Sequence, residues 1–137
     1  MRIVLLGSIF VFLVSSCANS NRQEKLGAIE ELDARIMLIH DEAMPKISKV
    51  LSLRKLVQQK IDSCQNSIEC NQWQAASYEL TKADAQMMDW MRKYQKPLGK
   101  DTAFSYLANQ EQIITKVSLD INSSISVADS LLNASKP

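Results

Sequence analysis

The chain of 137 residues is poor in several residue types, and each scarcity excludes a class of protein. It has three glycines, three prolines and no alternating stretch of β-branched residues, which disfavours β-sheet folds and favours helices. No apolar run reaches the roughly 20 residues that a membrane-spanning helix needs. Glycine-rich phosphate loops, dinucleotide fingerprints and zinc-protease signatures are absent from the sequence.

The single histidine, His40, further restricts catalysis. Metal-dependent phosphohydrolases of the HD type need several histidines, so His40-Asp41 does not match that motif. Neighbouring side chains on a helix diverge by about 100°, and we therefore do not expect Asp41 to orient the His40 ring in a Ser-His-Asp device. We expect no enzyme, and an acid–base pair of His40 with Asp84 is the remaining catalytic alternative.

The charges are nearly balanced, with 16 basic and 15 acidic residues. Nucleic-acid-binding proteins usually present a basic face, and binding to anionic lipid headgroups needs a polybasic cluster. We therefore expect no nucleic-acid partner and no electrostatic attachment to a membrane.

The amino-terminal segment has the order of a bacterial lipoprotein signal. Arg2 precedes an apolar stretch over residues 3–14, and two serines then precede Cys17. This order predicts a signal peptide over residues 1–16 and acylation of Cys17, with palmitate among the attached chains. The alternative is an ordinary signal peptide followed by a chance cysteine.

Removal of this signal peptide defines the rest of the chain. We expect an acylated cysteine and polar tether over residues 17–25 and a single helical bundle domain over residues 26–135. The lipid would anchor the protein to a membrane. Because Ala18, and not an aspartate, follows the cysteine, we expect the periplasmic face of the outer membrane.

Apolar residues at steps of three and four predict an all-α fold, an antiparallel three-helix bundle. The middle helix is expected from Asn71, with Gln74 completing a capping box, to near Gln95. Asp101 or Thr102 would cap the last helix. The apolar seams of the three helices are Ile29, Leu32, Ile36, Ile39, Ala43, Val50, Leu53 and Val57; Trp73, Ala76, Leu80, Ala83, Met87, Trp90 and Tyr94; and Leu107, Gln110, Ile114, Val117, Ile121, Ser124, Ala128 and Leu131.

Pro45 interrupts the first of these seams. It removes the backbone hydrogen bond to the Asp41 carbonyl, yet the apolar pattern continues in the same phase beyond it. We therefore expect one long helix kinked at Pro45. The alternative is a four-helix up-down bundle with a turn near residues 41–44.

Cys64 and Cys70 lie between two helical patterns. In an oxidising compartment this spacing predicts a disulfide that closes the first hairpin. It is not the Cys-x-x-Cys of a redox motif, and two cysteines with one distant histidine do not form a zinc site.

Methionines accompany the histidine at helical spacing. Thioethers with one imidazole suit Cu(I), and a haem held by one histidine and one methionine is a variant of the same hypothesis. The candidate ligands are Met37, His40, Met44, Met87, Met88 and Met91. The favoured interpretation is packing, with no cofactor and with Asp84 as the hydrogen-bond partner of His40.

Two clusters, one apolar and one basic, remain as candidate surfaces. Met88, Trp90 and Met91 are candidates for partner binding, since they exceed what one seam requires. The basic run, expected to be a solvated helix end, comprises Arg92, Lys93, Lys96 and Lys100.

Two short runs, residues 40–46 and 83–91, resemble a family of small lipoproteins from Bacteroidota, some of which are labelled viral A-type inclusion protein. The resemblance implies a helical lipoprotein in which the two runs face each other, and it implies no activity. We expect a membrane-anchored periplasmic lipoprotein, a non-enzymatic interaction or envelope-structural module that binds a protein partner or a second copy. The alternative is a bundle that binds copper or haem.

Overall fold

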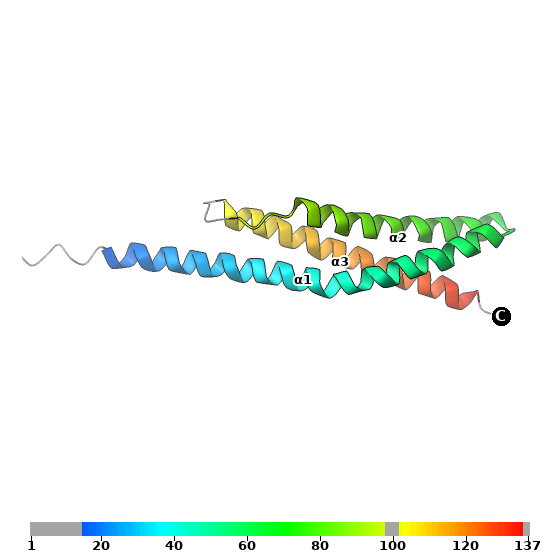
Figure 1. Ribbon diagram of the computed structural model, residues 1–137, viewed down its shortest axis with the longest axis horizontal. Coiled ribbons are helices and arrows are strands. Elements are labelled where there is room, and N and C mark those ends of the chain that lie inside the picture. Colours follow the sequence, from blue (N-terminus) through cyan, green and yellow to red (C-terminus); the bar gives the residue numbers. More distant parts are fainter. Residues whose placement is uncertain (1–14, 98–101, 136–137) are drawn as a thin grey trace, which may run out of the picture.

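The computed structural model describes the backbone of residues 15–97 and 102–135, and the side chains from residue 23 onward. Three helices, α1 (Ser15–Ser63), α2 (Ser67–Lys93) and α3 (Ala103–Ala134), pack against one another as an antiparallel bundle (Figure 1). The described residues contain no strand. The predicted all-α three-helix bundle is therefore confirmed.

The core follows the predicted seams closely. Side chains from all three helices form one continuous apolar cluster along the bundle axis, because residues at steps of three and four share a helix face. The largest of its fully buried side chains are Leu32, Ile36, Leu53, Leu80, Met87, Leu107, Ile114 and Ile121. Gln110 and Leu131, at the margins of the last seam, are half-buried.

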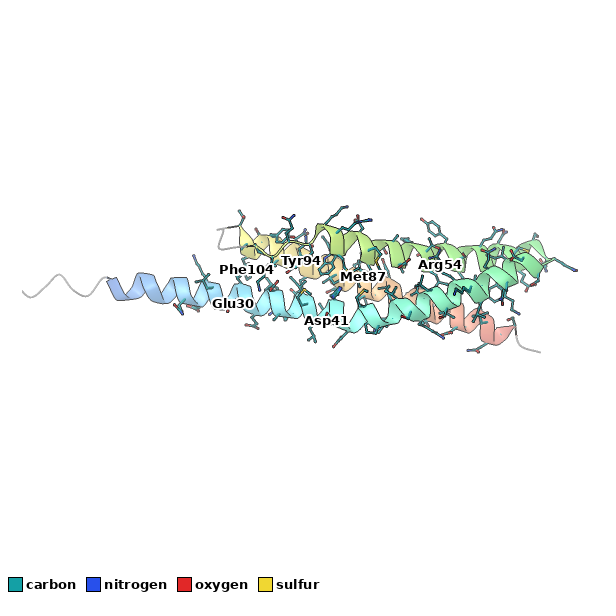
Figure 2. The ribbon with its side chains drawn as sticks, viewed as in Figure 1. Glu30, Asp41, Arg54, Met87, Tyr94 and Phe104 are labelled. Atoms are coloured by element: carbon teal, nitrogen blue, oxygen red, sulfur yellow. A yellow bond between two sulfur atoms is a disulfide. The ribbon has the colours of Figure 1, made fainter. Side chains whose placement is uncertain are left out.

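Helix α1 continues through Pro45 without a turn, so the four-helix alternative is wrong. Figure 1 shows that α1 changes direction about midway, near Asp41 in Figure 2. A proline inside a helix removes one backbone hydrogen bond and crowds the preceding turn, which accounts for a bend at this place. The bend lets both halves of α1 pack against the other two helices.

The boundaries of α2 differ from the prediction. The helix begins at Ser67, where the side chain of the N-cap residue Asn66 accepts a hydrogen bond from the Ile68 backbone N–H at 2.9 Å. Asn71 therefore lies inside the helix and does not cap it. At the other end α2 stops at Lys93, ahead of the expected Gln95. Thr102, one of the two candidates, occupies the N-cap position of α3, but its side chain makes no capping hydrogen bond; Asp101 lies outside the described residues.

The N-terminal part of α1 extends past the start of α3 (Figure 1). The backbone of residues 17–25, the segment expected as a polar tether, is helical. Its described side chains, residues 23–28, are all exposed, and a Cβ built on Gly27 would meet nothing within 4 Å beyond its own stretch of helix. This part of α1 has no helix packed against it. Residues 1–14 of the expected signal peptide lie outside the described residues.

Candidate functional site

Four aromatic rings from all three helices form a ladder near the end of α2. His40 of α1 lies against Trp90, with ring centroids 5.5 Å apart. Trp90 stacks on Tyr94 at 4.8 Å, and Tyr94 stacks on Tyr106 of α3 at 6.4 Å. The buried Nε1 of Trp90 has no hydrogen-bond partner, so stacking holds this ring. The contact of His40 with Trp90 also confirms that the two runs 40–46 and 83–91 face each other.

A buried carboxylate, Asp33, lies beside this aromatic ladder. Its side chain accepts a hydrogen bond from the Tyr94 hydroxyl and pairs with the Lys96 ammonium group. Burial acts to raise the pKa of Asp33, but the hydrogen bonds from Lys96 and Tyr94 outweigh burial, and the pKa lies below its ordinary value of 3.8. Burial and the neighbouring Asp33 raise the pKa of Tyr94 well above its usual range. At neutral pH Asp33 is therefore ionised, and its carboxylate is held by both the Tyr94 hydroxyl and the Lys96 ammonium group.

Sequence reasoning missed Asp33, although a signal for it was present. Asp33 follows Ile29 by four residues and precedes Ile36 by three, so it lies on the apolar side of α1. A carboxylate at such a position needs partners in the folded protein. One of them, Lys96, belongs to the basic run that was expected to be solvated. Its side chain is 61% exposed, and its ammonium group pairs with this buried acid. Lys100, also assigned to the solvated end, lies outside the described residues.

The environment of His40 corrects two expectations. Its Nδ1 lies 2.9 Å from Oδ1 of Asp41, so the adjacent carboxylate does orient the ring even though the two Cα–Cβ directions diverge. Because a carboxylate only accepts, Nδ1 is the nitrogen that donates in this bond, and Nε2 is the nitrogen with the lone pair in the neutral ring. Asp84, the expected hydrogen-bond partner of His40, instead pairs with Arg54 at 3.5 Å.

The methionines occupy two kinds of position. Met87 has no exposed surface and belongs to the core, as predicted for a seam residue (Figure 2). Met44, Met88 and Met91 are half-buried and pack against the core from its margin, and Met37 is 36% exposed. The six candidate ligands therefore do not form one set, since Met87 is separated from the surface group by its burial.

The candidate partner-binding residues are also divided by burial. Trp90 is only 5% exposed, and its ring is covered by His40 and Tyr94. A partner on this side of the bundle would contact Met88 and Met91 and would not reach Trp90. The basic residues Arg92 and Lys93 are exposed and pair with Asp89 of the same helix.

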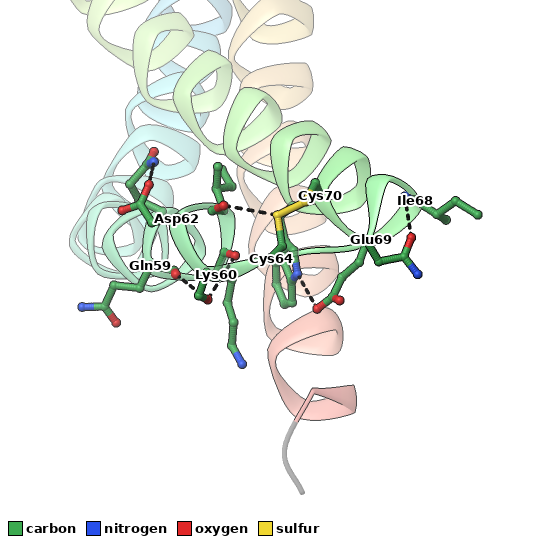
Figure 3. The surroundings of a disulfide bond; sticks show 12 residues. Gln59, Lys60, Asp62, Cys64, Ile68, Glu69 and Cys70 are labelled. Atoms are coloured by element: carbon green, nitrogen blue, oxygen red, sulfur yellow. Dashed lines mark hydrogen bonds between the residues drawn. A yellow bond between two sulfur atoms is a disulfide. The ribbon is translucent and has the colours of Figure 1, made fainter.

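Cys64 and Cys70 lie at disulfide-bonding distance, with Cα atoms 5.6 Å apart (Figure 3). Cys64 directly follows α1, and Cys70 is in the first turn of α2. The bond would therefore join the two helices across the short connection, residues 64–66, that links them in the chain. The geometric part of the disulfide prediction is confirmed. The pair lies at the connection between α1 and α2, at the opposite end of the bundle from the N-terminal part of α1 that extends past α3 (Figure 1).

The described residues contain no group of three or more histidine, cysteine, aspartate or glutamate side chains placed to hold a metal ion. Among the helices of the described residues, none has the length together with the hydropathy of a membrane-spanning segment. No protein-family model matches the chain, and neither a curated protein nor a solved structure is significantly similar to it. The function must therefore be argued from the chain's own residues.

Proposed function

We propose that this chain is a bacterial lipoprotein, anchored through acylated Cys17 to the periplasmic face of the outer membrane, that serves as a non-enzymatic interaction or structural module of the envelope. The observation that carries this proposal is the junction of the lipoprotein signal with α1. The helix that leaves Cys17 passes without a break into the core of the bundle. A lipid on this residue would thus be joined to the folded domain by helix alone.

The length of α1 supports a role in which the far end of the bundle is held well away from the membrane anchor. The 47 residues of α1 from Cys17 to Ser63 span about 70 Å at 1.5 Å per helical residue, less a small amount for the bend. The disulfide pair and the C-terminal end of α3 would then lie farthest from the anchor (Figure 1). Such an arrangement presents the sides and the distal end of the bundle to partners in the periplasm.

Exposed apolar side chains offer contact area for such partners. They are distributed over all three helices and include Leu38, Leu56, Ile68, Tyr78, Phe104 and Leu119. Ile68 is 69% exposed and lies at the distal end, beside Cys70 (Figure 3). Single exposed apolar residues are normal on soluble proteins, so these residues define the places to test and do not identify a partner.

The experiment has two stages. Mass spectrometry of the protein isolated from its native envelope should show a chain that begins at a diacylglyceryl-modified Cys17, and a Cys17→Ser variant should leave the outer-membrane fraction. Crosslinking from position 68 in the native envelope, with position 24 near the anchor as the matched control, should then capture a partner or a second copy. An unmodified, uncleaved N-terminus would refute the anchor. The absence of any crosslinked product from both positions would refute the interaction role.

A further inference from the structure

The register of α1 against α2 places Met88 and Met91 of α2 within about one to two helical turns of His40, Met37 and Met44 of α1 along the bundle axis. The two helices run in opposite directions, and the pairs Asp33 with Tyr94 and His40 with Trp90 fix how they align. A step forward along α1 therefore corresponds to a step back along α2. Met37, four residues after Asp33 and three before His40, lies level with residues 90–93 and so with Met91. Met44, four residues after His40, lies level with residue 86, which is about 3 Å along the axis from Met88.

The same residues lie on the facing sides of their helices. On α1, His40 faces α2 through its contact with Trp90, and Met37 and Met44 are three residues before it and four after it. On α2, Asp84 faces α1 through its ion pair with Arg54. Met88 and Met91 share that side of α2, because they follow Asp84 by four and seven residues. We call the residues Met37, His40, Met44, Met88 and Met91 the thioether seam.

The chemistry of the thioether seam is that of a soft-metal site. Thioethers bind Cu(I) in preference to harder ions, and a neutral imidazole is a good additional ligand. The Nδ1–H of His40 donates to Asp41, the arrangement that usually orients a metal-binding histidine and leaves Nε2 as the ligand atom. The Trp90 ring beside His40 can attract a cation through its face. The partial exposure of Met37 leaves one side of the seam open to solvent.

We propose that the thioether seam binds one Cu(I) ion through His40 Nε2 and methionine sulfur atoms from both helices. Met87 is not part of this site, because it has no exposed surface and its side chain fills the core. Haem is the weaker occupant, because Trp90 already covers the ring of His40 on the side facing α2. This proposal is independent of the lipid anchor, since every seam residue lies in the folded bundle.

Anaerobic titration of the full-length protein with Cu(I), in competition with a coloured Cu(I) chelator, tests the site. All samples carry Cys17→Ser and an oxidised Cys64–Cys70 pair, so that no free thiol competes for the ion. We expect one equivalent of Cu(I), quenching of tryptophan fluorescence through Trp90, and an unchanged far-UV spectrum. Ag(I), a soft ion that does not change oxidation state under these conditions, should bind with the same stoichiometry.

Matched variants locate the ion. Replacing Met37, Met44, Met88 and Met91 together with leucine preserves side-chain volume and should abolish binding. Met87→Leu, in the core, should retain the wild-type affinity. Asp41→Asn should weaken binding by roughly 10-fold, as expected for a residue that orients a ligand. If the fourfold variant does not fold, the half-exposed single variant Met37→Leu should still show weaker binding. Absence of binding by the wild type, or equal binding by wild type and seam variants, would overturn the proposal.

Discussion

Tyr94→Phe tests whether the buried carboxylate holds the end of α2 on α1. The change removes the hydroxyl that donates to Asp33 but retains the ring that stacks on Trp90 and Tyr106. A hydrogen bond to a charged group contributes about 1.5–3 kcal/mol, and Asp33 is only 7% exposed, so we expect the free energy of unfolding to fall by that amount at pH 7. Urea unfolding followed by far-UV circular dichroism measures the change.

Tyr106→Phe is the matched control. Its hydroxyl accepts a hydrogen bond from the exposed backbone N–H of Gln95 at 3.0 Å, and we expect its loss to lower the free energy of unfolding by about 0.5–1.5 kcal/mol. Equal effects of the two substitutions at pH 7 would refute the reasoning, because the charge and burial of Asp33 would then add nothing to the Tyr94 bond.

The pH dependence provides a second check on the same group. Burial acts to raise the pKa of Asp33, and the bonds from Lys96 and Tyr94 outweigh it, so this pKa is lower in the folded chain than its ordinary value of 3.8. A carboxyl of this kind stabilises the fold fully above its unfolded-state pKa and loses that effect as the pH falls. The difference in unfolding free energy between wild type and Tyr94→Phe should therefore narrow below about pH 4. A difference that stays constant down to pH 2 would contradict the assignment.

Three further predictions concern the disulfide, the core and the alkaline limit. Reduction of the Cys64–Cys70 pair should lower the free energy of unfolding by about 2–2.5 kcal/mol, seen as a lower urea midpoint with dithiothreitol, and a double serine variant should not respond to the reductant. Leu80→Ala, in the centre of the core, should lower the same free energy by about 2–5 kcal/mol, and a loss below 1 kcal/mol in a denaturation curve would contradict its burial. Because burial and a carboxylate raise the pKa of Tyr94, its stabilising effect is complete below about pH 10 and declines progressively as the pH rises from there toward the folded-state pKa, so wild type should lose more stability than Tyr94→Phe between pH 10 and 11.

The parts of the fold that depend on periodicity could be predicted from the sequence. Steps of three and four identified the core residues of all three helices, and the unchanged phase across Pro45 indicated one bent helix. The start of α2 could not be predicted in the same way, because Asn66 and Asn71 are both acceptable caps. The choice between them depends on where the chain turns, and only the folded structure shows that Asn66 accepts the Ile68 bond.

The candidate site was less predictable, because its contacts join residues far apart in the chain. Asp33 and Tyr94 are 61 positions apart, and the partner of a buried acid cannot be assigned until the helix register is known. The same ignorance of register led to the choice of Asp84 for His40, although Asp41 was adjacent. The methionines were correctly grouped on their helices, but periodicity alone could not separate the buried Met87 from the surface group.

The α1–α2 pair is fixed at its two ends by different means, and this makes a testable distinction. At the distal end Ile61 and Cys64 pack partly against the core, which there includes the buried Trp73, and the disulfide pair joins the helices. At the near end, Asp33 binds Tyr94 and Lys96 just after α2 stops. Between them the fully buried residues of the core hold the helices together.

Native-state hydrogen exchange should therefore respond locally, since opening free energies differ between parts of one fold. Reduction of the disulfide should speed amide exchange at the start of α2 and leave the turn after Lys93 unchanged. Tyr94→Phe should have the opposite pattern, and amides near Leu80 should respond only to the loss of global stability. Equal acceleration at both ends by either change would mean that the bundle opens as one cooperative unit, and the two ends would then not be separately fixed.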